Sequence, residues 1–226
     1  MRREVAVFCE DVLVVPRSMI LPPVGEAFLG ISGEDSDLLY ACIKQHSCFM
    51  DRASAENDER YKQIIPYFVF HIYNKLFVMQ RSNNANEKRL AGKLTLGIGG
   101  HVRAEDIQQE GSLFDWGLRE FSEEVAYAGS LRGELLGFIN DDTNAVGRVH
   151  LGAVFLLHGD SQEIAIRSEL VSGTLIEFPE CLLKKEAMES WSSLVCDALA
   201  IRFTELGTLA PVSSGKIIAW DAQKTI

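Results

Sequence analysis

The sequence predicts an α/β fold of the α+β type, a mixed β-sheet between helices, and two observations carry this prediction. A segment with helical periodicity near the middle of the chain is preceded and followed by runs rich in β-branched and aromatic residues. Strands on both sides of a central helix are typical of a sandwich with helices on the faces of one sheet. The 226 residues, 47% of them hydrophobic, suffice for one sizeable domain with extensions.

The first half of the chain contains the strands expected before this helix. The run DVLVVP predicts a short strand that Pro16 stops. Residues 17–62 mix short helical segments with loops, and within them the polar DRASAENDER predicts a solvated connection. The run QIIPYFVFHIYNKLFVMQRS predicts a hairpin that turns around Tyr73, Asn74 and Lys75. After it, GKLTLGIGGHV predicts a strand that leads into a glycine turn.

The helix and the elements after it are expected in the second half. SLFDWGLREFSEEVAYAG predicts a helix that begins near Leu113, with Ser112 and Asp115 in a capping arrangement, and ends at Gly129. ELLGFIND and RVHLGAVFLLHG predict two strands on either side of a polar loop, and GTLIEF predicts a further strand. Residues 183–206 are expected to be helical.

Composition restricts the classes of function. The net charge of −10 disfavours a nucleic-acid duplex as partner, because phosphate backbones bind clustered Lys and Arg. No segment approaches the apolar length of a membrane span, so no membrane partner is expected. The five cysteines form no C-x-x-C pair, which predicts free thiols in a reducing cytoplasm rather than a disulfide framework or a zinc knuckle.

The stretch REFSEEV places three carboxylates on one face of the predicted helix. At about 100° per residue, Glu120, Glu123 and Glu124 fall within one narrow arc, with Arg119 at its edge. A solvated acidic face is the simpler interpretation. However, like charges at this spacing repel, and they lie at the unfavourable end of the helix dipole. Both facts indicate a hard divalent cation, which would turn the repulsion into coordination.

Two glycines form the second feature. Gly99 and Gly100 directly follow a predicted strand, where the lack of a side chain lets a backbone approach a ligand closely. Glycine pairs at strand ends are more often only turns. The combination with the acidic helix is therefore the informative signal.

At these residues the sequence resembles the Nudix hydrolases, whose box is G-x5-E-x7-R-E-U-x-E-E-x-G-U with U a bulky apolar residue. The core R-E-U-x-E-E is matched by Arg119, Glu120, Phe121, Glu123 and Glu124, and the opening glycine by Gly100. The resemblance implies an N-terminal extension packed on the core (1–62), a Nudix-like α/β/α hydrolase domain (63–206) and a C-terminal extension or tail (207–226).

The loop before the helix departs from the box. Eighteen residues separate Gly100 from Arg119 where the pattern expects thirteen, and a glycine stands at position 111 where the first box glutamate is expected. Glu105 and Glu110 are alternatives for that glutamate. The expected box glycine at position 126 is an alanine.

The resemblance implies a hydrolase that uses Mg²⁺ or Mn²⁺ to cleave a nucleoside diphosphate linked to another group. By motif position, the metal ligands would be Glu123, Glu124, the Gly99 carbonyl and Glu120, which would also help to activate the nucleophile. Arg119 would hold the glutamates in place by an ion pair. Two further alternatives stay open, a non-catalytic nucleotide-binding module and an isomerase acting on a diphosphate ester.

The remaining site residues are expected outside the acidic helix. Gly100 and His101 would contact the small, phosphorylated, nucleotide-like substrate. Asp141 and Asp142 are candidates for the general base, with an ordinary Asp-rich turn as the simpler interpretation. His150, on an alternating strand, is expected to be a hydrogen-bonded sheet histidine rather than a site residue. A homodimer is an open alternative to a monomer.

Overall fold

The computed structural model describes residues 10–21, 28–81, 92–108, 111–167, 170–210 and 217–220. Its α-helices are α1 (Arg17–Ile20), α2 (Ser36–His46), α3 (Arg52–Ala55), α4 (Leu113–Glu124), α5 (Ala145–Val149), α6 (Phe178–Leu183) and α7 (Ser190–Leu206). The strands before α4 are β1 (Asp11–Pro16), β2 (Gly30–Ser32), β3 (Cys48–Asp51), β4 (Tyr61–Ile72), β5 (Lys75–Arg81), β6 (Leu94–Thr95) and β7 (Gly97–Gly99). Those after it are β8 (Val125–Tyr127), β9 (Leu131–Asn140), β10 (His150–Gly159), β11 (Ile164–Ile166), β12 (Leu170–Glu177) and β13 (Ile217–Trp220).

The main sheet is mixed and is built around a long parallel pair. Strands β4 and β10 run parallel, with His150 opposite Gln63, whereas β9 is antiparallel to β10. On the other side, β5 and β12 continue the order β12-β5-β4-β10-β9-β13. Nearly all of β4 is buried, which explains its almost continuous apolar sequence, because a strand covered on both faces shows no polar alternation.

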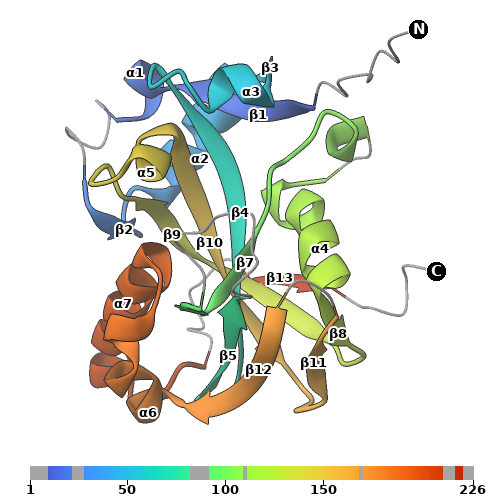
Figure 1. The fold of residues 1–226 in the computed structure, drawn as a ribbon, viewed down its shortest axis with the longest axis vertical. Coiled ribbons are helices and arrows are strands. Elements are labelled where there is room, and N and C mark those ends of the chain that lie inside the picture. The colour runs from blue at the N-terminus through green and yellow to red at the C-terminus, as the bar shows by residue number, and fades with distance from the viewer. Residues whose placement is uncertain are drawn as a thin grey trace, which may run out of the picture.

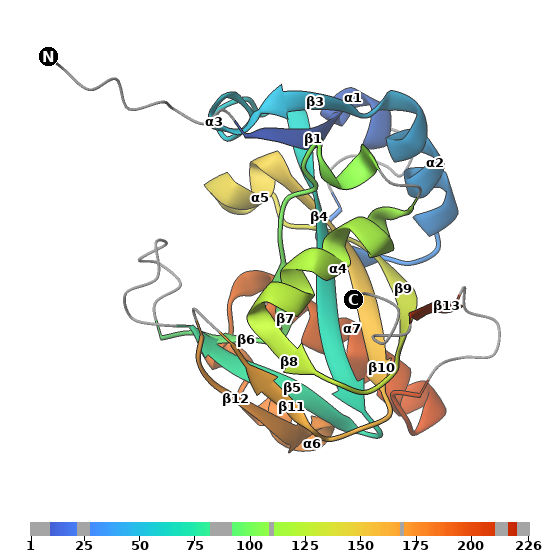
Figure 2. The same ribbon diagram turned by 90° about the vertical axis from the view of Figure 1, so that its right-hand side faces the viewer.

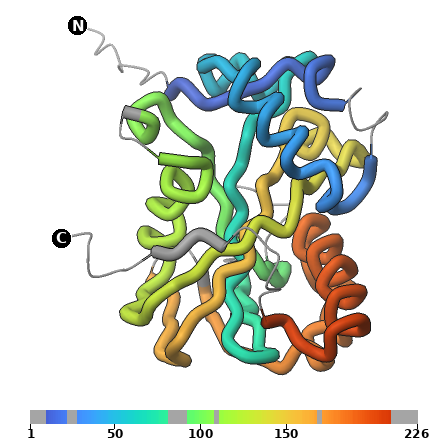
Figure 3. The backbone as a smooth tube through the Cα atoms, turned by 180° about the vertical axis from the view of Figure 1, so that it is seen from behind, coloured from blue at the N-terminus to red at the C-terminus, as the bar shows by residue number. Residues whose placement is uncertain are grey.

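Helices cover both faces of this sheet (Figure 1). In the view turned by 90°, α4 lies in front of β4 and β10, and α7 lies behind them (Figure 2). From behind, the two helices again lie on opposite flanks of the strands (Figure 3). Each face has its own apolar core: Phe68 packs with the α4 side chains, and Tyr67 with those of α7. The predicted mixed sheet between helices is confirmed.

The N-terminal segment continues the main sheet. Strand β1 pairs antiparallel with both β3 and the start of β4. Helix α2 adds Leu39 and Ile43 to the core that α4 covers. Strand β4 begins at Tyr61, so the boundary expected between residues 62 and 63 lies inside a strand. Among the described helices, none is long and apolar enough to cross a membrane.

The central helix is shorter than the sequence predicts. It begins at Leu113 with the expected Ser112–Asp115 capping box, but ends at Glu124 rather than at Gly129. Val125 takes extended backbone angles and starts β8, which pairs antiparallel with β11. The helical prediction failed here because the partner strand lies far along the chain, where local periodicity cannot detect it.

Two other segments also differ from expectation. The polar stretch DRASAENDER contains the short helix α3, which Asp51 caps through a hydrogen bond from the Ser54 amide. The helix expected over residues 183–206 is divided into the end of α6, a 3₁₀ turn (Lys185–Ala187) and α7. The expected hairpin around Tyr73 is present, and Tyr73 has the positive φ of 52° that its tight turn requires.

Candidate functional site

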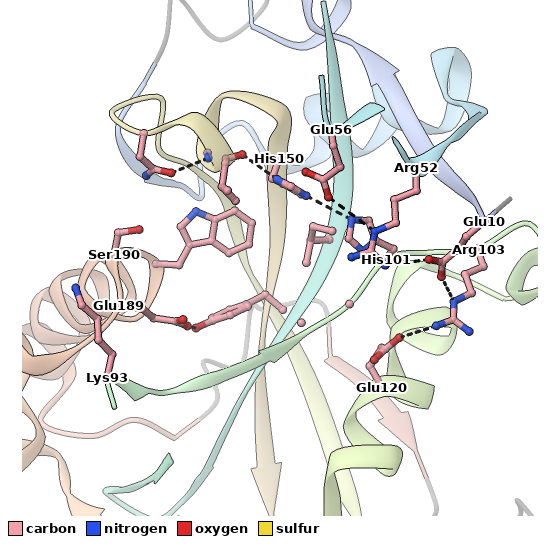
Figure 4. Close-up of a pocket in the computed structure, with 18 residues that line it drawn as sticks. Glu10, Arg52, Glu56, Lys93, His101, Arg103, Glu120, His150, Glu189 and Ser190 are labelled. Atoms are coloured by element: carbon pink, nitrogen blue, oxygen red, sulfur yellow. Dashed lines mark hydrogen bonds and ion pairs between the residues drawn. The ribbon is translucent and has the colours of Figure 1, made fainter. Parts of the chain in front are cut away.

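A cavity of about 510 Å³ opens beside the N-terminal half of β4. Its walls come from the N-terminal segment, β4, the glycine bend after β7, α4, the α5–β10 junction and the start of α7. Lys93, Glu189 and Ser190 lie towards one end, and Arg103, Glu10 and Glu120 towards the other (Figure 4). The site thus joins segments that are far apart in the sequence.

Glu120 and the glycine bend are the predicted residues that the cavity brings together. Gly99, Gly100, His101 and Glu120 all line it. The Glu120 side chain packs so closely on the bend that a Cβ at Gly100 would lie 2.2 Å from Glu120 Cγ. Glycine is therefore required at position 100 for the carboxylate to lie where it does.

Arg119 forms ion pairs with the acidic side chains of α4 and of the loop before it. Its guanidinium donates to Asp106 Oδ1 at 3.1 Å and lies 2.9 Å from Glu120 Oε1. It also donates to Glu123 Oε1 at 3.1 Å. Burial alone would lower the pKa of Arg119, but Asp106, Glu120 and Glu123 together raise it. The guanidinium therefore stays charged and positions the Glu120 carboxylate.

The three box glutamates occupy different environments. Glu120 is 17% exposed and lines the cavity, whereas Glu123 is 57% exposed and faces Arg119. Glu124 is half-buried at the end of α4. Of these three residues, Glu120 alone is among the described residues that form the cavity wall.

A chain of ion pairs connects Glu120 to the N-terminal segment. Arg103 Nη2 lies 3.9 Å from Glu120 Oε1, and Arg103 Nε lies 2.6 Å from Glu10 Oε1. Glu10 also accepts a hydrogen bond from Arg52 at 2.9 Å. Burial alone would raise the pKa of Glu10, but the two arginines outweigh it and lower the pKa. Two guanidinium groups are therefore held at the cavity wall.

Two histidines meet on the same wall. The Nε2 atoms of His101 and His150 are 3.4 Å apart, and His150 Nδ1 donates to the Val146 carbonyl at 2.8 Å. Burial and the nearby charges of Arg52, His150 and Arg103 lower the pKa of His101 to about 3. His101 is thus neutral near pH 7. His150 is hydrogen-bonded as expected, but its ring also lines the cavity.

The far end of the cavity is aromatic. Trp191 packs edge-on against Tyr67, with the ring centroids 5.5 Å apart. The Tyr67 hydroxyl donates to Glu189 Oε1 at 3.0 Å, and burial raises the pKa of Tyr67. This end therefore offers a fixed aromatic surface with a carboxylate beside it.

Asp141 and Asp142 are engaged in the turn before α5. Asp141 is 1% exposed and accepts hydrogen bonds from the Thr143 amide and the Asn144 side chain. Asp142 forms ion pairs with Arg17 and with Lys62, whose Nζ lies 2.6 Å away. Neither aspartate is among the described residues that line the cavity. Glu105 is exposed, and Glu110 lies outside the described residues.

Several residues of the cavity wall come from outside the box and were not predicted from the sequence. Arg52 and Glu56 belong to the stretch expected to be a solvated connection, and Trp191 lies at the start of a helix predicted only by its periodicity. Trp191 offered only a weak signal, because aromatic side chains commonly line ligand pockets but also pack in cores. Arg52 and Glu56 had no comparable local signal.

An α/β/α sandwich in which an R-E-U-x-E-E helix packs on a glycine bend beside a cavity defines the class of Nudix folds. The crystal structure of Tm1382, a proposed Nudix hydrolase, is 33% identical to the chain, with a TM-score of 0.73, and the match covers 86% of this chain and 100% of that one. Protein YmaB of Bacillus subtilis (strain 168) is 33% identical over 203 residues, which are 84% of this chain and 97% of the relative. No protein-family model matches the chain.

The chain belongs to the Nudix hydrolase family, as its similarity to Tm1382 over the whole of that structure shows. Membership supports hydrolysis of a pyrophosphate bond in general.

Proposed function

We propose that the protein is a divalent-metal-dependent hydrolase that cleaves the pyrophosphate bond of a nucleoside diphosphate linked to another group. The observation that carries this proposal is the Glu120 carboxylate, which lies against the Gly99–Gly100 bend on the wall of the cavity. Mg²⁺ is commonly held by one or two carboxylates together with phosphate oxygens. The site therefore fits Mg²⁺ or Mn²⁺.

The proposed ligands are Glu120 and the Gly99 carbonyl, with Glu123 and Glu124 as further ligands from the box. When bound, the ion supplies positive charge that stabilises the negative charge developing on phosphate oxygens. Arg119 positions Glu120 through the 2.9 Å ion pair and does not itself contact substrate. The role of general base stays a prediction for Asp141 and Asp142.

The chain's own residues fit the rest of such a substrate. Arg52 and Arg103 provide cations near Glu120 that would bind phosphate oxygens, and His101 is a neutral hydrogen-bonding group beside them. Trp191, at the other end, provides a ring on which a nucleobase would stack. The arginines line one end of the cavity, and the Trp191 ring lies towards the other. This arrangement suits a molecule with one charged end and one aromatic end.

A second candidate is a Nudix-fold module that binds a nucleotide without cleaving it. It is favoured by the placement of Glu123, which is exposed and paired with Arg119 rather than part of the cavity wall. Of the three box glutamates, only Glu120 then lines the cavity. One carboxylate suffices to bind a nucleotide through a metal ion, but catalysis by a metal ion usually uses more carboxylate ligands.

The test is release of phosphate or nucleotide from a panel of nucleoside diphosphate compounds with Mg²⁺ or Mn²⁺. We expect turnover that falls about 100-fold or more in Glu120→Gln, because an electrostatic group acting on the transition state is lost. Glu205→Gln, on the exposed side of α7, is the matched control and should keep full activity. Single Gln variants of Glu123 and Glu124 test the further ligands. Nucleotide binding without turnover in the native protein would favour the module.

A further inference from the structure

Three side chains from distant parts of the chain meet on one wall of the cavity, away from α4. Glu56 follows α3, His101 follows the glycine bend, and His150 is the first residue of β10. One ligand atom from each lies within 4.8 Å of the others, and all three residues line the cavity (Figure 4). The box glutamates contribute nothing to this cluster.

The two imidazoles are oriented like a pair of metal ligands. A carbonyl oxygen only accepts, so the Val146 contact places a proton on His150 Nδ1 and leaves the Nε2 lone pair towards His101. A backbone carbonyl holding the other ring nitrogen is the usual support of a metal-binding histidine. The 3.4 Å between the Nε2 atoms is long for a hydrogen bond. Two nitrogens about 2.0–2.1 Å from a tetrahedral ion would be separated by about 3.4 Å.

The charges around the cluster allow a cation. Arg52 carries a positive charge beside the cluster, but its 2.9 Å hydrogen bond goes to Glu10, and its contact with Glu56 is a longer 3.8 Å. Arg103 is likewise paired with Glu10. The Glu56 carboxylate thus supplies a negative charge that Arg52 neutralises only weakly.

A buried amide lies next to the cluster. Gln63 is opposite His150 in the parallel β4–β10 register, so the two side chains project to the same face of the sheet. Gln63 is fully buried, and neither its amide nitrogen nor its oxygen has a hydrogen-bond partner among the residues that the structure describes. A buried amide in this condition is expected beside a site that holds a further polar group.

We propose that Glu56, His101 and His150 bind a divalent transition-metal ion of the Zn²⁺ class, with its open coordination positions facing the cavity. Two imidazoles and a carboxylate suit Zn²⁺, Co²⁺ or Fe²⁺, whereas Mg²⁺ prefers oxygen ligands. The cavity would then hold this cation beside the glycine bend, on side chains other than Glu120. This site does not rest on the proposed hydrolysis, because it uses none of the box glutamates.

The experiment is calorimetric titration of the full chain with ZnCl₂, followed by an anomalous-scattering map of Zn²⁺-soaked crystals. We expect one equivalent to bind, with density beside the two Nε2 atoms, and no competition from millimolar Mg²⁺. His150→Gln and Glu56→Gln should each weaken Zn²⁺ affinity by at least about 100-fold, since even outer-sphere partners of a metal contribute 10–100-fold. Glu56 is exposed, so its variant reports on binding even if the His150 variant fails to fold.

Two control variants locate the ion. His46→Gln, in α2, removes a histidine outside the cluster and should leave the affinity unchanged. Glu120→Gln should also leave Zn²⁺ affinity unchanged, although it should lower the proposed turnover by about 100-fold or more. The proposal is overturned if Zn²⁺ does not bind, if Glu56→Gln binds it as tightly as the native protein, or if the affinity is lost in His46→Gln or Glu120→Gln instead.

Discussion

Glu120 Cγ lies so close to the backbone of Gly100 that a single added methyl group would come within 2.2 Å of it. This contact couples the glycine bend to the acidic helix, two features that the sequence separates by an unusually long loop. It also means that the position of the Glu120 carboxylate depends on the absence of a side chain at residue 100.

Gly100→Ala is expected to lower turnover by about 10- to 100-fold, because a displacement of about 1 Å in a catalytic group can cost that much. The Glu120 side chain can rotate away, so the free energy of unfolding should change by less than about 2 kcal/mol. Steady-state kinetics and urea unfolding measure the two effects. In the Glu120→Gln background the same substitution should have little further effect on turnover; equal losses in both backgrounds would contradict the coupling.

Lys62→Met is expected to lower the free energy of unfolding by about 3–5 kcal/mol, the usual cost of removing one partner of a buried ion pair. Lys62 is fully buried, and its Nζ donates to Asn140 Oδ1 at 2.7 Å, Asp142 Oδ1 at 2.6 Å and the Gly147 carbonyl at 2.6 Å. Urea titration measures the change.

The matched control for this variant is Lys75→Met. Lys75 is 34% exposed and lies 3.9 Å from Glu177, so its loss should cost less than about 1 kcal/mol. A similar cost at both positions would show that the hydrogen bonds of Lys62 contribute little.

Stability should fall as the pH drops below about 6.5, and His71 should be one cause. Burial, and next the charge of His158, lower the pKa of His71 to about 3, with Arg202 and Glu134 also facing this pair. The unfolded chain takes up a proton near pH 6.5 and the folded chain does not, so acid favours unfolding between these values. Each unit of pH then removes up to about 1.4 kcal/mol.

The measurement is urea unfolding between pH 7 and pH 4. His71→Gln should reduce the slope of stability against pH, whereas His46→Gln, in α2, should not. An unchanged slope in His71→Gln would show that other groups cause the acid sensitivity.

Trp191→Ala is expected to raise KM about tenfold or more with a smaller change in kcat, because base–aromatic stacking contributes about 1–3 kcal/mol. Trp191→Phe should retain most of the affinity. Kinetics with a nucleotide substrate and a substrate that lacks the base measure the effect. An equal rise in KM for both substrates would place the base elsewhere.

Part of the site could be predicted because it lies within a few turns of one helix. The apolar residues Phe114, Leu118 and Phe121 recur at helical spacing, so the acidic residues between them had to lie on another face. Spacing could not show that Glu120 faces the cavity while Glu123 faces Arg119. That difference depends on which neighbours each side chain meets, and Asp106, Gly100 and Arg103 come from the loop before the helix.

The end of the central helix was mispredicted for a related reason. Its residues after Glu124 keep an acceptable helical pattern, but β11 offers Val125 and its neighbours a strand partner. Tertiary pairing overrides weak local preference in such a case.

The class of fold, the capped acidic helix and the glycine bend could all be predicted from local patterns, because each follows from the period of side chains along the chain or from residues a few positions apart. The composition of the cavity depends instead on long-range packing. Arg52 and Glu56 reach it because β1 joins the N-terminal segment to β4, and Trp191 reaches it because α7 packs on the sheet. Contacts between segments so distant depend on how the whole sheet is ordered, which no local pattern encodes.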